Sequence, residues 1–245
     1  MIDRRPRDET ESFCLRFLPP APARVLEVGC GAGELAAALT GRGYSVVALD
    51  ADPNEAAAAR GRGVDAREAR WPDAAPLPDE RFDAVLFTRS LHHIGPLDGA
   101  VAAARASLRP GGRVLVEDFA FAAAPPAAAE WLRGVLRLLD AAGALEAAPG
   151  SFAARLLAAS DAAAEWRHAA DHDIHPAAAM EGSLAAQLTI EASERAPYLY
   201  RYVAPALAAS TRGGELLARV LEAERAMAAA GALDLIGRRW VARAD

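Results

Sequence analysis

Lysine is absent from this 245-residue chain, in which all 27 basic residues are arginine. Chemistry that needs a lysine amine, such as a Schiff base or the lysine of a phosphate-binding loop, is therefore excluded. Asparagine occurs once, at Asn54, whereas alanine, arginine, glycine and proline are abundant. This bias is typical of a GC-rich genome, so we expect a bacterial source. Many alanine positions carry no pattern, which weakens the helical periodicity.

Cysteines and long apolar runs are also scarce. The two cysteines, Cys14 and Cys30, are too few for a disulfide framework. No apolar run reaches the roughly 20 residues of a membrane-spanning helix, and the charged residues 1–9 are unlike a signal peptide. We therefore expect a cytoplasmic protein with no membrane partner. The net charge of −6 disfavours nucleic acid as a partner.

Short apolar runs alternate with helical segments through the first half of the chain. Expected strands lie at 24–28, 45–50, near 64, and at 84–87, 113–118, 187–194 and 235–242, and expected helices at 8–18, 34–40, 53–60, 96–108, 152–168, 197–207 and 214–230. Strands that read as continuous apolar runs indicate a parallel sheet covered on both faces. We therefore predict an α/β fold whose ligands bind at the carboxyl ends of the strands.

The stretch 121–185 differs from the rest because it is rich in alanine and has no strand signal. Residues such as Trp131, Val135 and Leu139 give it one periodic apolar helix face. We interpret it as a helical lid inserted after the fifth strand of a single domain, 1–245. As a lid, it would roof the site at the carboxyl edge of the sheet.

A glycine-rich loop follows the first expected strand. It has the pattern Gly29-x-Gly31-x-Gly33, and glycines there allow a tight turn and a close approach of the backbone to a ligand. A dinucleotide fingerprint needs a further glycine at the next position, which is Glu34, and a glutamate there would repel a phosphate. Asp50 ends the second strand, where a carboxylate can accept hydrogen bonds from both hydroxyls of a ribose. The alternative is that Asp50 only begins the next helix, as an N-cap residue does.

Four segments in this order resemble the motifs of class I S-adenosylmethionine-dependent methyltransferases, of the type 11/12-like domain. Residues 25–33 look like motif I, 47–53 like the acidic loop, 82–94 like the fourth-strand motif and 108–116 like the turn before strand five. The match covers about residues 24–118. The resemblance implies a Rossmann-like, mostly parallel seven-stranded sheet of order 3-2-1-4-5-7-6, with strand seven antiparallel.

The resemblance also implies which residues hold the S-adenosylmethionine cofactor. These are Glu27, Gly29, Gly31, Gly33, Asp50 and Ala51, with the backbone of Thr88 and Arg89 at the methionine end. The chain departs from the family at Trp71, where an acidic residue usually reads the adenine amino group. Glu68 is the expected substitute, with Asp65 a weaker one, and Trp71 could stack on the adenine.

Histidines and tyrosines supply the candidates for the acceptor site. His92 and His93 follow the fourth strand, and either could be a base, or both could merely fix the loop. His168, His172 and His175 share one face of a helix and could line the site from the lid, or could simply favour the end of a helix. Asp171 and Asp173 lie near them, but we expect no metal because Pro176 suggests that the helix is ending and no cysteine is near. Tyr198, Tyr200 and Tyr202 would share one face of a strand as a pocket wall, with core packing as the alternative.

Three functions are consistent with these motifs to different degrees. We expect an S-adenosylmethionine-dependent methyltransferase that acts on a small molecule. The alternative is a protein that binds S-adenosylmethionine as a sensor without transferring a methyl group. A nicotinamide-dependent dehydrogenase is disfavoured by Glu34. We also predict that the histidine and tyrosine groups converge on one cavity.

Overall fold

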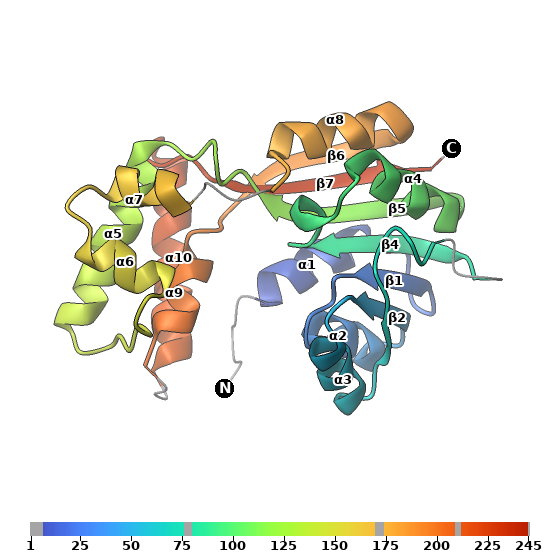
Figure 1. The fold of residues 1–245 in the computed structure, drawn as a ribbon, viewed down its shortest axis with the longest axis horizontal. Coiled ribbons are helices and arrows are strands. Elements are labelled where there is room, and N and C mark those ends of the chain that lie inside the picture. Colours follow the sequence, from blue (N-terminus) through green and yellow to red (C-terminus); the bar gives the residue numbers. More distant parts are fainter. Residues whose placement is uncertain (1–6, 76–79, 170–173, 209–211, 245) are drawn as a thin grey trace. The chain divides into compact units, whose positions relative to one another are not determined.

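The computed structural model describes residues 7–75, 80–169, 174–208 and 212–244. A seven-stranded sheet organises them in the order β3-β2-β1-β4-β5-β7-β6 (Figure 1). Its strands are β1 (Arg24–Val28), β2 (Ser45–Asp50), β3 (Asp65–Glu68), β4 (Phe82–Thr88), β5 (Leu108–Phe119), β6 (Thr189–Ala196) and β7 (Gly237–Arg243). The order confirms the prediction.

Strands β1 to β5 run in parallel, and β7 runs against them. The pairs β1–β2, β1–β4, β2–β3 and β4–β5 are all parallel. Ala244 N donates to Gly112 O, and Ala120 N donates to Ile236 O, so each end of β5 meets the opposite end of β7. The carboxyl ends of β1, β2, β4 and β5 therefore lie at one edge of the sheet, where such folds bind ligands.

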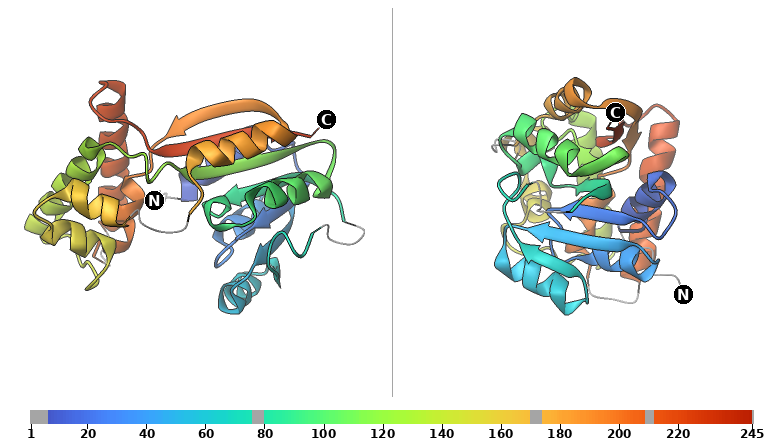
Figure 2. Two further views of the ribbon diagram at one scale, coloured as in Figure 1. Left: turned by 45° about the horizontal axis from the view of Figure 1, so that its top comes forward. Right: turned by 90° about the vertical axis from the view of Figure 1, so that its right-hand side faces the viewer.

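Helices cover both faces of this sheet (Figure 2). Neighbouring strand residues point to opposite faces, so Val25 and Leu26 are both fully buried in different halves of the core. The Val25 half packs against α1 (Arg7–Phe17), α2 (Glu34–Gly41) and α3 (Pro53–Gly61), and the Leu26 half against α4 (Leu97–Ser107) and α8 (Ala177–Gln187). This two-sided burial explains why the strands are continuous apolar runs.

The chain divides into two compact units. The sheet unit comprises Glu9–Phe119, Ile174–Glu194 and Arg238–Asp245, and the helical unit includes Ala120–Asp173 and Arg195–Gly237. Helices α5 (Pro126–Ala141), α6 (Phe152–Ala158), α7 (Ala162–Ala169), α9 (Tyr200–Val203) and α10 (Gly213–Ala229), with the 3-10 helix η2 (Ala204–Ala206), belong to the helical unit. No helix in the described ranges is both long enough and apolar enough to cross a membrane.

The predicted lid, 121–185, does not coincide with the helical unit. Its last part, α8, belongs to the sheet unit, where Ser183 Oγ donates to Asp98 Oδ1 on α4 at 2.6 Å. The helix predicted at 152–168 is also two helices, because Asp161 Oδ1 accepts a hydrogen bond from Ala164 N at 2.9 Å and begins a new one. That this region roofs the acceptor site stays a prediction.

The structure confirms part of the helix predicted at 197–207, so the three tyrosines do not share one face of a strand. Residues 200–203 form α9, and the wholly buried Glu224 of α10 explains why. Its carboxylate accepts backbone hydrogen bonds from Tyr198 N at 2.7 Å and from Leu199 N and Tyr200 N at 3.0 Å each. Glu224 thus satisfies the backbone amides at the start of the helical turn.

Replacing Glu224 by glutamine is expected to lower the free energy of unfolding by about 1–2 kcal/mol. The amide oxygen cannot serve all three donors, and the new NH₂ group would face a backbone N–H. Urea denaturation measures the change. Glu222→Gln is the matched control, because that exposed side chain on the same helix forms an ion pair with Arg219, and its loss should stay within about 0.5 kcal/mol. Equal losses in the two variants would refute the capping role.

Candidate functional site

The loop after β1 turns sharply beside the end of β2. Gly29 N and Cys30 N both donate to Leu49 O, at 2.8 and 3.0 Å. Gly29 and Gly31 have φ angles of 72° and 52°, a backbone conformation that side chains rarely adopt. The backbone therefore makes the tight turn that the glycine spacing predicts.

Two neighbouring segments press against this loop. A Cβ on Gly29 would lie 2.5 Å from Ser90 Cβ, and a Cβ on Gly33 would lie 2.5 Å from Ala59 Cβ of α3. Ser90 is held in place because its Oγ donates to Val28 O at 2.6 Å. The loop can approach its neighbours this closely only because positions 29 and 33 are glycine.

Asp50 joins the end of β2 to the glycine loop. Its Oδ2 accepts a hydrogen bond from Gly31 N at 2.7 Å, and its Oδ1 accepts one from Asp52 N at 2.9 Å. Asp52 is the residue that caps α3, since its Oδ1 accepts from Asn54 N at 2.8 Å. The half-buried Asp50 carboxylate has further lone pairs for other donors, and the exposed Ala51 follows it.

The end of β3 lies next to Asp50. Glu68 is its register partner and is exposed. Trp71 is buried, donates from Nε1 to Ala100 O at 3.1 Å, and packs against Phe87 with ring centroids 6.5 Å apart. The suggestion that Trp71 stacks on an adenine is therefore wrong, because its ring is part of the sheet core.

Glu27 is a buried carboxyl at the end of β1. Thr88 Oγ1 donates to its Oε1 at 3.0 Å, and Oε2 has no hydrogen-bond partner among the described residues. Burial raises the pKa of Glu27 to about 7, and the hydrogen bond from Thr88 opposes that rise. A buried acid with one unused oxygen suits a cationic ligand.

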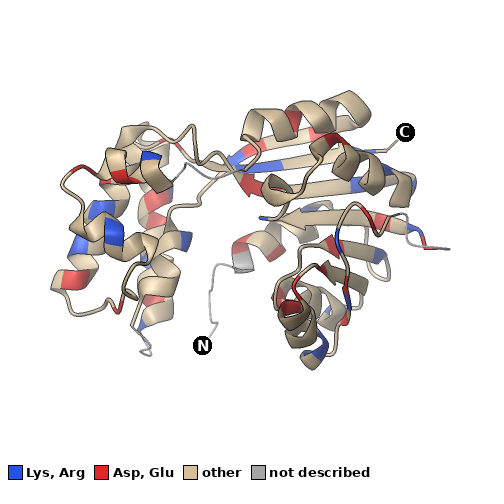
Figure 3. Cartoon of the chain, viewed as in Figure 1, with Lys and Arg blue, Asp and Glu red and all other residues tan. Residues whose placement is uncertain are grey.

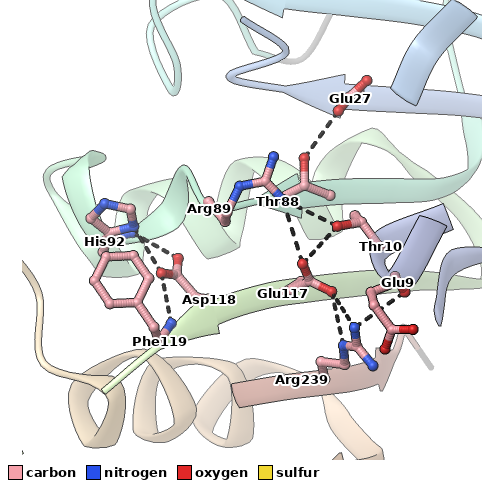
Figure 4. Close-up of polar contacts among 10 residues, drawn as sticks. All are labelled: Glu9, Thr10, Glu27, Thr88, Arg89, His92, Glu117, Asp118, Phe119 and Arg239. Atoms are coloured by element: carbon pink, nitrogen blue, oxygen red, sulfur yellow. Dashed lines mark hydrogen bonds and ion pairs between the residues drawn. The ribbon is translucent and has the colours of Figure 1, made fainter. Parts of the chain in front are cut away.

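A buried ionic network lies beside this edge of the sheet (Figure 4). Glu117 of β5 accepts from Thr10 Oγ1 at 2.7 Å and from Arg239 Nε at 2.8 Å, and Arg89 Nη1 lies 3.4 Å from it. Arg239 Nη2 also donates to Glu9 O at 3.1 Å. These contacts tie α1 to the ends of β4, β5 and β7. They also hold the side chain of Arg89, whose φ of 64° turns its backbone.

Asp118, the next residue of β5, faces a histidine instead of an arginine. His92 of the 3-10 helix η1 (Leu91–His93) places its Nδ1 2.8 Å from Asp118 Oδ1, and both side chains are buried. The ring of His92 lies 4.0 Å from the ring of His93 and 4.7 Å from that of Phe119, measured between centroids. His93 itself is exposed.

His175 reaches the same loop from the start of the segment that leads into α8. Its backbone N donates to His92 O at 2.8 Å, and its ring Nε2 lies 3.0 Å from Ile94 O. The structure thus brings one member of the predicted lid cluster to the loop after β4. A ring nitrogen beside a carbonyl oxygen must donate, so the Nε2 of His175 carries a proton there.

The other predicted acceptor residues belong to the helical unit or lie outside the described residues. His168 is exposed on α7 in the helical unit, and His172 lies outside the described residues. Tyr198 and Tyr202 have ring centroids 5.7 Å apart, and Tyr202 also packs with three helical-unit rings, those of Phe121, Phe152 and Trp166. Tyr200 is buried. Their convergence with the histidines of the sheet unit stays a prediction.

Two acidic residues of this edge were not among the predicted site residues. Glu117 and Asp118 end an apolar strand at the ligand-binding edge, which is the signal that identified Asp50. Nothing in the sequence separates their roles, because the arginine that neutralises Glu117 lies 122 positions away.

Comparison with known proteins identifies a family whose sequence profile matches this chain. The profile of the methyltransferase domain family matches residues 2–178. A ubiquinone biosynthesis O-methyltransferase of Xanthomonas axonopodis pv. citri (strain 306) is 35% identical over 105 residues, which cover 40% of this chain and 44% of that protein. The match spans less than half the length of such curated relatives.

Solved structures share the fold over nearly the whole chain. An S-adenosylmethionine-dependent methyltransferase from Mesorhizobium loti aligns with a TM-score of 0.53 at 18% identity, covering 94% of this chain and 95% of that one. The [4+2]-cyclase SpnF aligns with a TM-score of 0.58 at 20% identity, covering 96% and 79%. At these identities the likeness concerns the fold.

Proposed function

Because this chain belongs to the methyltransferase domain family, we propose that it transfers a methyl group from S-adenosylmethionine to a small molecule. The observation that carries the proposal is the junction of the glycine loop with Asp50, through the 2.7 Å bond from Gly31 N. It puts a carboxylate that can accept from ribose hydroxyls beside the glycine backbone of the loop.

The residues present fit this cofactor. Gly29 and Gly33 leave no room for a Cβ, and the described atom nearest to the place of a Cβ on Gly31 is Glu55 Oε2, at 3.8 Å. Glu27 holds a buried oxygen without a hydrogen-bond partner in the described part of the chain, and the cofactor carries positive charge on its sulfonium and ammonium groups. When bound, the cofactor supplies an electrophilic methyl group on sulfur, and the chain has to align an acceptor with it.

A small acceptor is proposed over nucleic acid because of charge. The chain has a net charge of −6, and acidic residues are interspersed among the basic ones on both units (Figure 3). Binding a polyanion needs a concentrated basic surface. His92 and His93 remain the candidates for proton transfer, and Glu68 the candidate for reading the adenine.

Tritium-labelled methyl transfer tests the proposal. The protein is incubated with S-adenosylmethionine labelled in its methyl group and with a bacterial extract, which is then separated by size. We expect label in the small-molecule fraction, and an Asp50→Ala control should reduce it. Label only in nucleic acid or protein would contradict the small-molecule acceptor. Tight binding without any transferred label would favour the sensor alternative.

Cofactor affinity is expected to rise up to about tenfold between pH 6 and pH 7.5. Only ionised Glu27 attracts a cation, and its pKa of about 7 means that ionisation grows through this interval. The favourable contribution is therefore present above pH 7 and lost below it. Calorimetric titration at several pH values measures this change. Glu27→Gln should flatten the dependence, and an equally steep dependence in that variant would assign it to another group.

A further inference from the structure

Arg89, the first residue after β4, is the only residue other than glycine with a positive φ in the described part of the chain, at 64°. A side chain makes this conformation costly, and residues held in it gather at functional sites. Arg89 lies at the carboxyl edge of the sheet, where such folds bind ligands. The turn therefore has to be stabilised by its surroundings, and its place points to a role at the ligand-binding edge.

The turn at Arg89 determines where Ser90 lies. Ser90 packs on the glycine loop so closely that a Cβ on Gly29 would lie 2.5 Å from the Cβ of Ser90. Its Oγ also donates to Val28 O at 2.6 Å, at the start of the same loop. Because Ser90 follows Arg89 directly, a change of φ at Arg89 would move Ser90 away from these contacts. The turn and the packing of Ser90 on the glycine loop are thus one structural feature.

Three contacts hold Arg89 in this turn. Its backbone N donates to Glu117 O at 2.7 Å. Its guanidinium Nη1 donates to Thr10 Oγ1 at 3.2 Å and lies 3.4 Å from Glu117 Oε1 (Figure 4). Thr10 and Glu117 are buried, and a hydrogen bond of 2.7 Å joins their side chains. The side chain of Arg89 is therefore anchored on groups that are themselves fixed.

Neutralisation of Glu117 does not explain the contact with Arg89. Arg239 already neutralises that carboxylate, because its buried guanidinium donates from Nε to Glu117 Oε2 at 2.8 Å. The side chain of Arg89 is 38% exposed and lies farther from the carboxylate, at 3.4 Å. An ion pair of a partly exposed group at this distance contributes little to stability. The contact fixes the side chain of Arg89, and with it the turn.

We propose that Thr10 and Glu117 are positioning residues for the cofactor, which act through the turn at Arg89. By holding the guanidinium they keep φ positive, and the turn keeps Ser90 packed on the glycine loop. Neither residue has to touch the cofactor for this effect. The inference rests on the proposed function, since the glycine loop is the proposed cofactor site. It also gives α1 a part in cofactor binding, because Thr10 belongs to that helix.

Glycine and alanine at position 89 test whether the turn matters. Glycine adopts a positive φ as readily as a negative one, whereas alanine does not and lacks the contacts that hold the turn. We therefore expect S-adenosylhomocysteine, the demethylated form of the cofactor, to bind Arg89→Gly roughly fivefold or more tightly than Arg89→Ala in calorimetric titration. Both variants lack the guanidinium, so its effect on the charge of Glu27 cancels in the comparison. Equal affinities would overturn the proposal.

Valine and serine at position 10 test the anchor. Thr10→Val keeps the shape of the side chain but loses the hydroxyl that Arg89 and Glu117 share, so the affinity should fall about three- to tenfold. Thr10→Ser keeps the hydroxyl and should recover most of that affinity. Glu11→Gln is the matched control, because Glu11 lies on the same helix and forms an ion pair with Arg42. This variant should bind within about twofold of the wild type.

The outcomes separate this inference from the proposed function. Unfolding curves of the ligand-free variants identify those that fold, and affinities are compared among these. If the wild type binds S-adenosylhomocysteine and Thr10→Val binds it as tightly as Thr10→Ser does, this inference alone is wrong. If the wild type binds neither S-adenosylhomocysteine nor S-adenosylmethionine, the proposed function is wrong as well.

Discussion

Replacing Asp50 by alanine is expected to weaken the binding of S-adenosylmethionine about a hundredfold. The variant loses a carboxylate that the ribose hydroxyls would share, and charge-assisted hydrogen bonds contribute about 1.5–3 kcal/mol each. It also releases Gly31 N, which Asp50 Oδ2 holds at 2.7 Å. Both losses act in the same direction, and about 2.7 kcal/mol corresponds to a hundredfold. Calorimetric titration of the purified protein measures the change.

Asp52 provides the matched control for this variant. It lies two residues away, is exposed, and caps α3 through its bond to Asn54 N. Asp52→Ala should therefore cost about 1 kcal/mol of stability, as the loss of an N-cap does, and leave cofactor affinity nearly unchanged. Equal loss of affinity in the two variants, or no loss in a folded Asp50→Ala protein, would show that Asp50 does not hold the cofactor.

Replacing Gly29 by alanine is expected to lower the free energy of unfolding by about 3 kcal/mol and to abolish measurable cofactor binding. The φ of 72° alone costs about 1–2 kcal/mol for a residue with a Cβ. The new Cβ would also lie 2.5 Å from Ser90 Cβ, so the loop must move. Denaturant unfolding and calorimetric titration measure the two effects.

Gly63 is the control that separates the cost of the positive φ from the cost of the contact with Ser90. Its φ is 80°, but a Cβ there would meet no atom of the described residues within 4 Å. Gly63→Ala should therefore show the conformational cost alone, about 1–2 kcal/mol, and keep cofactor binding. Adding Ser90→Gly to Gly29→Ala removes the clashing atom and should restore part of the stability. If Gly63→Ala lowers the free energy of unfolding as much as Gly29→Ala does, the close approach to Ser90 does not contribute to the loss.

The sheet could be predicted from the sequence because its determinants are local. Strands β1, β2 and β4 and the second half of β5 are short apolar runs bounded by glycine, proline or aspartate, and the order of four motifs implied the topology. The helices of the helical unit were harder to predict, because an alanine-rich sequence does not show where one helix ends and the next begins. The turn at Asp161 and the place of α8 in the sheet unit follow from single side-chain contacts.

Long-range contacts explain the remaining differences. A helix was predicted at 197–207, but the residue that caps its first turn, Glu224, lies more than 20 positions later and could not be identified from the sequence. Trp71 aligns with a cofactor-binding position of the family but fills the core next to Phe87. At the candidate site, the sequence located the glycine loop and Asp50, whereas the contact between Asp118 and His92 depends on two segments that no spacing could pair.

Transfer of a ¹³C-labelled methyl group is the measurement that tests the central claim most directly. S-Adenosylmethionine labelled in its methyl carbon is mixed with the protein and the small-molecule fraction of a bacterial extract, and carbon NMR follows the label over time. The account predicts that the sulfonium methyl signal declines while a new methyl signal of a small molecule grows, and that Asp50→Ala slows both changes. A sulfonium signal that persists although the protein binds the cofactor would contradict it.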